Sequence, residues 1–524
     1  MSLTSSSTSS DARNIPVWLA DGLAALSVVL VLIPQSLAYA ELAGMPPHYG
    51  LYAAALPPIA AAFFASSIYL QTGPTALTGI LTFGALASVF SPASSEFVLA
   101  ASLLALAVGL WRVAIGVFKL GAIAYFMSQP VLRGFTTAAA LLIISSQLPS
   151  AVGLSPPSGT VVEELLWTLT RASSWQPLAL LMAGLSAVII IISKRLSPLL
   201  PGVFVAVVVT TVLSVFVNYN GPIVGSVDVA RVPITLPWQV MRDLATEASW
   251  SAFFELLPQL LISGLVIAVV GFAEATSIAR AFAAETRSRW NPNQEFISQG
   301  VANLASSLVS GFPVGGSFSR SALSRTAGAK SRWNGAITGA LVFAALPLMP
   351  LLARLPNAVL SAIVIVSVSK LVRFKPMLTL WRLSRPQFVT AWLTFVATLL
   401  LSPRLDYAIL VGIGASLLIH LYRQMQLTVT SYYDDDSLYV VPSGVLWFGS
   451  VQRFEDAVDR LLASDVSISS IVIDGRSLGH VDLSGAMAIV DSLQDAQASG
   501  ISIEIQGLSE RMMRIIDELR LEQH

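Results

Sequence analysis

The 524-residue chain contains no cysteine, and this absence excludes several kinds of chemistry. Disulfides, thiolate zinc sites, Cys-ligated iron–sulfur clusters and thiol catalysis all require that residue. Histidine is almost as scarce, because the whole chain holds only 4, which leaves little room for an imidazole metal site. We therefore expect no metal and no cofactor, and we do not expect an enzyme.

Charged residues are also scarce. They make up 11% of the chain, whereas they make up about 25% of an ordinary soluble chain. Hydrophobic residues make up 55%, and the mean hydropathy is +0.73. This composition excludes a water-soluble enzyme of this size.

The formal net charge of zero conceals two regions of opposite charge. Residues 432–524 hold 6 basic and 16 acidic residues, and the part before them holds 24 basic and 14 acidic residues. The sequence therefore predicts a basic, apolar body that is followed by an acidic, soluble domain.

Fourteen apolar segments follow one another along the body, and a membrane-spanning helix needs roughly 20 such residues. They lie at 16–43, 49–67, 75–90, 96–118, 130–149, 176–193, 202–217, 254–284, 293–310, 318–328, 333–352, 356–370, 386–402 and 406–422. We expect a transmembrane domain over residues 15–425. The polar, Ser-rich residues 1–14 predict a disordered cytoplasmic tail.

The positions of the basic residues test this helix count. If both termini are cytoplasmic, 17 Lys and Arg residues fall in inner segments, Arg112 among them, and 5 fall in outer segments. This excess agrees with the positive-inside rule along the whole body. We therefore expect an integral protein of the plasma or inner membrane with both termini in the cytoplasm.

Two of the fourteen segments are short, and Gly and Pro residues interrupt the chain just before each of them. Residues 69–74 precede the third segment, and residues 311–316 precede the tenth. These places correspond if the fourteen helices form two inverted repeats of seven. Interrupted segments at matching positions indicate the midplane binding site of a transporter. The alternative is two loops that line nothing.

The starts of these two short helices are suited to an anion. A helix N-terminus presents unpaired N–H groups and the positive end of a dipole, so two facing starts favour an anion between them. Small residues there let a ligand approach the backbone. The candidate contacts are Thr75 and Ala76 at one start, and Ser317, Phe318 and Ser319 at the other.

Charged and polar residues at membrane depth add further candidates. Arg320 opposes the dipole of its helix, so it needs either an anionic ligand or a nearby carboxylate. Glu274 lies well inside an apolar segment, where a carboxylate can exchange a proton in each transport cycle or simply neutralise Arg320. Gln35 and Tyr39 follow Pro34 on one helix face and can orient an oxyanion, unless they form a satisfied buried pair.

The acidic domain, residues 431–524, has a different periodicity. Strands are predicted at 437–442, 445–448, 468–474 and 501–506, and helices at 452–462, 484–498 and 509–521. This order predicts a small α/β domain. Ser484 stands where a helix N-cap would be; the alternative is a phosphorylatable or partner-contacting, regulatory serine.

Several motifs resemble those of the sulfate permease (SulP) family of anion transporters. The run from Ile33 to Ala40, the segment from Leu42 to Pro47 and the triplet Gly50-Leu51-Tyr52 are similar to its first signature. Asn293-Gln294-Glu295 and the run from Gly311 to Arg320 resemble its second. The acidic domain resembles a STAS domain, named for sulfate transporters and anti-sigma-factor antagonists.

The resemblance implies an architecture and a set of site residues. It implies two inverted repeats of seven helices, with a core of helices 1–4 and 8–11 and a gate of helices 5–7 and 12–14. It also implies a homodimer and an elevator-like motion. Gln35 and Tyr39 match substrate-site positions, Ser319 and Arg320 match the anion-contacting pair, and Glu274 matches an acid linked to proton coupling.

The function expected from this resemblance is secondary active transport of a small anion, foremost proton-coupled sulfate symport. Alternatives are sodium-coupled transport of bicarbonate or a dicarboxylate, an anion exchanger or channel, a voltage-responsive membrane motor, and a receptor that signals through its STAS domain. The expected partners are the anion, a proton or sodium ion, membrane lipid and a second copy of the chain. No nucleic acid is expected.

Overall fold

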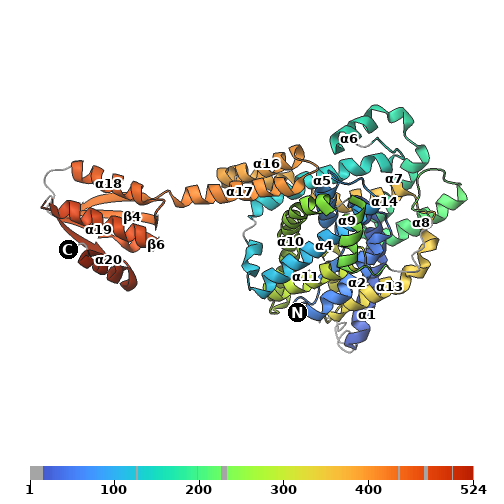
Figure 1. The fold of residues 1–524 in the computed structure, drawn as a ribbon, viewed down its shortest axis with the longest axis horizontal. Coiled ribbons are helices and arrows are strands. Elements are labelled where there is room, and N and C mark those ends of the chain that lie inside the picture. The colour runs from blue at the N-terminus through green and yellow to red at the C-terminus, as the bar shows by residue number, and fades with distance from the viewer. Residues whose placement is uncertain are drawn as a thin grey trace, which may run out of the picture. The chain divides into compact units, whose positions relative to one another are not determined.

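A computed structural model describes residues 16–125, 128–157, 159–197, 199–225, 233–248, 250–434, 437–464, 470–498 and 500–522. The predicted disordered tail, residues 1–14, lies outside the described residues. The chain divides into two compact units, residues 1–413 and 414–524, and each is treated by itself below. The first is built of helices and the second contains a mixed sheet (Figure 1).

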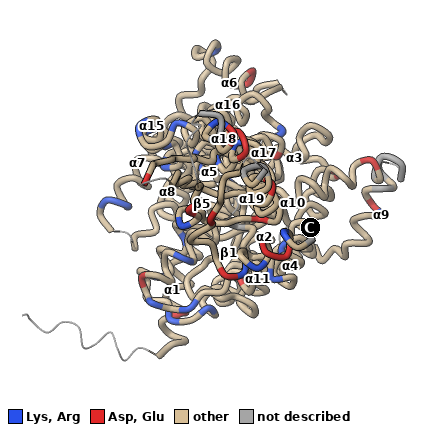
Figure 2. The backbone as a smooth tube through the Cα atoms, turned by 90° about the vertical axis from the view of Figure 1, so that its left-hand side faces the viewer, with Lys and Arg blue, Asp and Glu red and all other residues tan. Residues whose placement is uncertain are grey.

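A helix overlaps each of the fourteen predicted apolar segments. These helices are α1 (Val17–Leu42), α2 (Tyr49–Phe64), α3 (Ala76–Leu86), α4 (Ser95–Val117), α5 (Gln129–Ala151), α7 (Pro177–Leu196), α8 (Gly202–Phe216), α10 (Trp250–Thr286), α11 (Pro292–Leu308), α12 (Phe318–Thr326), α13 (Trp333–Ala345), α14 (Asn357–Val368), α16 (Arg385–Leu400) and α17 (Leu405–Gln424). In the described part of the chain, 8 helical stretches are long and apolar enough to cross a membrane, and α2, α3 and α8 are shorter apolar helices. Most of the backbone in Figure 2 is tan, as this scarcity of charge requires.

Among the described residues of the first unit, three α-helices lie outside the predicted segments. They are α6 (Val161–Thr170), α9 (Pro237–Ala248) and α15 (Phe374–Leu383). Each is short and carries charged residues on one side, so a search for long apolar runs passes over it. The start of α6 is defined by a capping box, in which Thr160 and Glu163 each satisfy the other's backbone N–H.

Glycines allow close packing where α4 lies along α11. A Cβ added at Gly109 would stand 2.7 Å from a side-chain carbon of Leu304. One at Gly116 would stand 2.6 Å from the carbonyl oxygen of Asn293. Without water to drive helices together, association within a membrane depends on such close contact between small residues. This packing fixes α11 and the irregular segment after it against the interior of the unit.

The described part of the second unit contains the end of α17 and a five-stranded sheet with three further α-helices. The strands are β3 (Thr428–Asp434), β4 (Ser437–Leu446), β5 (Ser470–Asp474), β6 (Leu478–Val481) and β7 (Ser502–Gln506), and the helices are α18 (Val451–Ser464), α19 (Leu483–Ala498) and α20 (Glu510–Glu522). The strand order is β3-β4-β5-β7, with β6 paired to β4; β3 is antiparallel to β4 and the remaining pairs are parallel. Leu438, Ile473, Phe454 and Ile489 lie in a hydrophobic core that belongs to this unit alone.

The strand prediction for this unit needs two corrections. Residues 437–442 and 445–446 form one strand, β4, because the positive φ of Gly444 is accommodated as an irregularity in its pairing with β6 rather than as a break. The sequence from Trp447 to Ser450 is a turn. Strands β3 and β6 were not predicted. The four residues of β6 are too few to display an alternating pattern.

Ser484 is not the N-cap of its helix, contrary to the prediction. Helix α19 begins at Leu483, and the carboxylate of Asp482 accepts a hydrogen bond from the backbone N–H of Gly485 at 2.8 Å. A carboxylate is the better cap here because it also accepts from the N–H of Phe448 at 3.3 Å. The regulatory reading of the Ser484 hydroxyl stays a prediction.

The position of the cap can be tested by two substitutions. We expect Asp482→Ala to lower the unfolding free energy of the isolated 426–524 domain by about 1 kcal/mol, the usual contribution of an N-cap. The matched control, Ser484→Ala, should change it by no more than a few tenths of that. Urea denaturation measures both. Equal losses in the two variants would contradict the assignment.

A second test concerns Asp474, which holds Arg476 at the end of β5. The Arg476 Nη2 donates to the carboxylate at 2.6 Å and its Nε at 2.9 Å. These hydrogen bonds keep the pKa of Asp474 below its ordinary value. The folded state therefore holds the Asp474 proton less tightly than the unfolded state does. The pair's contribution to folding stability is fully present above about pH 4, the ordinary Asp pKa. It is lost as the pH falls through the lowered pKa of the folded state.

We therefore expect Asp474→Asn to destabilise the 426–524 domain most at neutral pH. The difference from the parent should shrink as the pH is lowered below about 4, where the parent carboxylate also becomes protonated. Urea midpoints across a pH series provide the measurement. A difference that stays constant over the series would show that the pair does not contribute through its charge.

Candidate functional site

The two interrupted segments meet in the interior of the first unit. They form two short strands, β1 (Gln71–Gly73) and β2 (Gly315–Ser317), which pair antiparallel with Gln71 opposite Ser317 and Gly73 opposite Gly315. All six residues are buried. Because each strand leads into a short helix, α3 and α12 start from opposite ends of this two-stranded ribbon.

The start of α3 is closed by its own side chains. The hydroxyl of Thr75 accepts from the N–H of Thr78 at 3.1 Å, and the hydroxyl of Thr78 returns to the N–H of Thr75 at 3.3 Å. This capping box uses the polar groups of Thr75 within the helix. Ala76 follows in the first turn and is buried. The small residues Thr75 and Ala76 thus lie at the start of α3 as predicted, but the Thr75 hydroxyl already has hydrogen-bond partners within the helix.

The start of α12 is open by comparison. Ser317 is its N-cap residue, yet its hydroxyl makes no hydrogen bond to the N–H groups of the first turn. The hydroxyl instead lies 3.4 Å from that of Ser319. The two helix starts are therefore not equivalent, and the dipole end of α12 is the one without a side-chain cap.

Arg320 lies in the first turn of α12 and is fully buried. Its Nη1 donates to the side-chain oxygen of Gln35 on α1 at 3.5 Å, while Nε and Nη2 have no hydrogen-bond partner among the residues that the structure describes. A Cβ added at Gly73 would stand 3.4 Å from Nη2. The guanidinium thus lies where α1, β1 and α12 meet. A buried cation with open donors is costly unless an anion joins it, and a guanidinium binds oxyanions through two parallel hydrogen bonds.

Tyr39 and Glu274 lie near the same guanidinium. Both interact with Arg320 electrostatically, and Tyr39 is almost fully buried one helical turn beyond Gln35. Helix α10 brings Glu274 there because Gly316 packs against Ala275, where an added Cβ would meet the Ala275 Cβ at 3.1 Å. The ion pairs within 4 Å among the described residues do not include one between Glu274 and Arg320. The carboxylate is close to Arg320 without using its donors.

Phe318 and Ser319 differ from the other candidates in their exposure. Phe318 is 57% exposed, and its ring stacks on that of Phe282 with 6.2 Å between centroids. Ser319 is also exposed. The structure therefore gathers Gln35, Tyr39, Glu274 and Arg320 in one place and puts the Phe318 ring with the aromatic side chain of α10.

Arg112 was wrongly assigned to an inner loop, because the structure buries it completely within α4. Its guanidinium donates to the carbonyl oxygens of Ala268 at 3.1 Å and Val314 at 2.9 Å. It thereby ties α10 to the segment that leads into β2. The sequence could have indicated this buried position, because Arg112 lies inside the apolar segment 96–118 and a charged residue at membrane depth is a candidate functional residue by default.

Two amides complete the support of the ribbon, and sequence reasoning missed both. Asn303 on α11 donates to the Val314 carbonyl at 3.0 Å and accepts from the Val314 N–H at 2.9 Å. Gln299, one turn earlier, donates to the hydroxyl of Thr72 at 2.7 Å. No pattern marks these residues, because an amide in a helix reveals neither its depth nor its partner.

Comparison with known proteins identifies the family. The model of the sulfate permease family matches residues 19–394, and that of the STAS domain matches residues 429–524. Sulfate transporter 4.1 of Arabidopsis thaliana is 30% identical over 522 residues, which cover 93% of this chain and 74% of the relative. The probable sulfate transporter Rv1739c of Mycobacterium tuberculosis is 33% identical over 406 residues, or 76% of this chain and 70% of the relative.

Solved structures show the same fold. The murine anion transporter Slc26a9 in its inward-facing state superposes with a TM-score of 0.83 at 21% identity, covering 95% of this chain and 87% of that one. The transmembrane domain of the cyanobacterial bicarbonate transporter BicA gives 0.62 at 21% identity, covering 76% and 97%. The chain therefore belongs to the sulfate permease family and is an integral membrane anion transporter with a STAS domain at residues 429–524.

Proposed function

We propose that this transporter carries sulfate together with a proton and binds the sulfate at Arg320. The observation that carries the proposal is the buried Arg320 guanidinium at the uncapped start of α12. Its Nε and Nη2 lack partners in the described part of the chain. A dianion there would accept from the guanidinium and from the N–H groups of the first helical turn. Gln35 and Tyr39 would orient it from α1, and the start of α3, with Thr75 and Ala76, would face it from the other side of the ribbon.

Sulfate is the preferred substrate because relatives that are 30% and 33% identical to this chain are named sulfate transporters. A tetrahedral dianion also suits a single guanidinium supported by small residues and a helix dipole. The sodium-coupled bicarbonate alternative has the support of BicA, but that likeness concerns the fold alone.

A proton is the preferred coupling ion because Glu274 lies close to Arg320 without pairing with it. When the carboxylate is ionised it competes electrostatically with an anion for the same guanidinium. Protonation removes that competition, so proton and anion binding would favour each other. A cattle relative, 28% identical over 523 residues, is named a sodium-independent sulfate anion transporter, which accords with this choice.

The proposed motion is an elevator-like movement of a core against a gate within two inverted repeats of seven helices. The antiparallel pairing of β1 with β2 supports this, because it relates the third and tenth apolar segments by an approximate two-fold axis. The proposed arrangement includes a homodimer, with the STAS domain in a regulatory role and both termini in the cytoplasm. The mass of the purified chain in lipid nanodiscs tests the dimer.

Uptake of labelled sulfate into proteoliposomes tests the proposed function. We expect uptake that is accelerated by acid outside, is insensitive to sodium, and is inhibited most strongly by unlabelled sulfate in a panel with bicarbonate, succinate, chloride and nitrate. Uptake that follows sodium and ignores the pH gradient would favour the bicarbonate-type alternative. Currents without accumulation would favour a channel.

A further inference from the structure

Arg112 of α4 is a buried charge to which the proposed function assigns no role. Its side chain is fully buried, and a guanidinium stays charged at physiological pH. The ion pairs within 4 Å among the described residues include none with Arg112. It donates instead to three backbone carbonyls, those of Ile267 at 3.3 Å, Ala268 at 3.1 Å and Val314 at 2.9 Å. Burial of a cation without a counter-ion costs free energy, so this arrangement requires an explanation.

Gly271 of α10 leaves the space that this guanidinium occupies. A Cβ added at Gly271 would stand 2.7 Å from the Arg112 Nη2. The carbonyl oxygen of Gly271 would lie 3.9 Å from a Cβ added at Gly315, and Ala275, one turn later, packs on Gly316. Helix α10 therefore runs along β2 from Gly271 onward. The hydrogen bonds of Arg112 fasten the helix to the segment before β2 where this contact begins.

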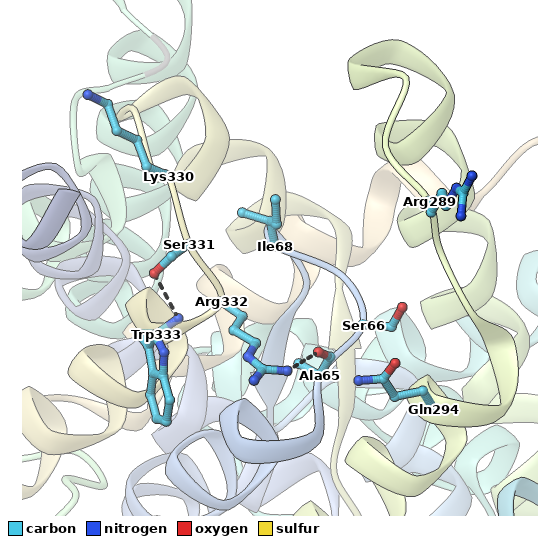
Figure 3. A pocket seen from close by; sticks show the side chains of 9 residues that line it. All are labelled: Ala65, Ser66, Ile68, Arg289, Gln294, Lys330, Ser331, Arg332 and Trp333. Atoms are coloured by element: carbon cyan, nitrogen blue, oxygen red, sulfur yellow. Dashed lines mark hydrogen bonds between the residues drawn. The ribbon is translucent and has the colours of Figure 1, made fainter. Parts of the chain in front are cut away.

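A neutral side chain holds the other strand of the ribbon in a corresponding way. Asn334 of α13, the helix after α12, is fully buried and donates to the carbonyl of Ile68 at 3.1 Å, in the segment before β1. Figure 3 shows Ile68 on this segment and Trp333, the neighbour of Asn334, on the segment beside it. Arg112 of α4, the helix after α3, does the same for the segment before β2. In the described part of the chain, the hydrogen bonds of Asn334 do not extend to α10, whereas those of Arg112 do.

The two ends of the ribbon also differ in what has to be held. The start of α3 is closed by its own capping box, whereas Arg320 at the start of α12 has donors without partners among the described residues. A shift of α10 along β2 that brought the Glu274 carboxylate to those donors would close them to an anion. Glu274 lies one turn beyond Gly271 on α10. The contacts of Arg112 therefore fix the helix that carries Glu274 relative to the start of α12.

We propose that Arg112 is a positioning residue of the anion site. It holds α10 and the start of α12 at the separation that keeps Arg320 open to the anion. This inference rests on the proposed binding of sulfate at Arg320. A guanidinium suits the task because it presents five N–H donors in fixed directions and so reaches the carbonyls of two elements at once.

Sulfate affinity of the purified full-length transporter, together with the KM and maximal rate of uptake into proteoliposomes, tests the proposal. Arg112→Gln keeps a donor for one carbonyl and loses the others. We expect it to weaken sulfate binding and raise the KM about tenfold, because the anion must then break a charge-assisted hydrogen bond between Arg320 and Glu274. The maximal rate per folded transporter should stay near that of the parent.

Two further arginine variants accompany this measurement. Arg112→Lys should recover part of the affinity, because it keeps the charge and a donor but lacks the fork. The matched control is Arg133→Gln, which alters an exposed arginine of α5 and should bind sulfate as the parent does. Equal losses in Arg133→Gln and Arg112→Gln would overturn the proposal.

Gly271→Ala displaces the same guanidinium by a second route. The new methyl group would collide with the Arg112 Nη2, so we expect a similar loss of affinity. The control is Gly184→Ala in α7, where an added Cβ meets nothing within 4 Å. The double variant Arg112→Gln, Gly271→Ala should bind no more weakly than the weaker single variant, because the shorter glutamine leaves room for the methyl group. Additive losses would show that the two residues act independently and would overturn the proposal.

Arg320→Ala in the same assays separates this inference from the proposed function. If Arg320→Ala weakens binding and Arg112→Gln does not, Arg112 has no positioning role and the anion site stands. If Arg320→Ala leaves binding unchanged, the proposed site fails and this inference fails with it. A lower maximal rate at an unchanged KM in Arg112→Gln would assign Arg112 to the stability of the fold alone. If Arg112→Gln does not fold, the same outcomes apply to Gly271→Ala and Arg112→Lys.

Discussion

Substitution of Arg320 by alanine is expected to weaken sulfate binding by roughly 10- to 100-fold, which corresponds to the loss of about 1.5–3 kcal/mol from a charge-assisted hydrogen bond. The physical reason is that the variant removes the buried cation at the open start of α12. The KM for sulfate uptake into proteoliposomes measures the effect.

Two further variants make this result specific. Arg320→Lys should restore binding only in part, because a lysine keeps the charge but lacks the planar fork. Arg325→Ala is the matched control on the same helix, since Arg325 pairs with Glu285 and lies over the ring of Phe282. An unchanged KM in Arg320→Ala, or an equal rise in Arg325→Ala, would contradict the assignment of the anion to Arg320.

The second large effect is expected from Glu274→Gln. Glutamine mimics the protonated carboxylate, so the variant should still bind sulfate and exchange it across the membrane. It should lose accumulation driven by an inward proton gradient, because no proton then enters with the anion. Sulfate uptake at symmetric pH and with acid outside separates the two activities.

Glu285→Gln is the control for this variant, because Glu285 lies on the same helix and is paired with Arg325 outside the proposed site. It should respond to the pH gradient as the parent does. A Glu274→Gln variant that also keeps the full response would show that Glu274 is not the proton carrier. Loss of all exchange in that variant would show that its carboxylate is needed for binding.

The apolar segments and the interrupted helices could be predicted because each depends on local sequence. A run of about 20 apolar residues has few alternatives to a membrane helix. Gly and Pro next to a short helix mark irregular backbone, as at β1 and β2. Arg320 and Glu274 stand out as candidates in the same way, because a charge within such a run requires an explanation.

Pairings between distant segments could not be predicted. Nothing in the sequence indicates that Gln71 lies opposite Ser317, or that Arg112 reaches the carbonyl of Val314. The choice of Asp482 over Ser484 as the cap of α19 has the same origin, because the second hydrogen bond comes from Phe448, 34 residues earlier. Such contacts depend on how whole elements pack, and residue type alone does not reveal them.

The measurement that tests the central claim most directly is the affinity of the purified transporter for sulfate as a function of pH. If Arg320 binds the anion and Glu274 binds the proton, lowering the pH should tighten sulfate binding in the parent, because the two ligands favour each other. Calorimetric titrations at several pH values should show this for the parent and a pH-independent affinity for Glu274→Gln. A parent affinity that does not change with pH, or a Glu274→Gln variant that retains the full dependence, would contradict the account.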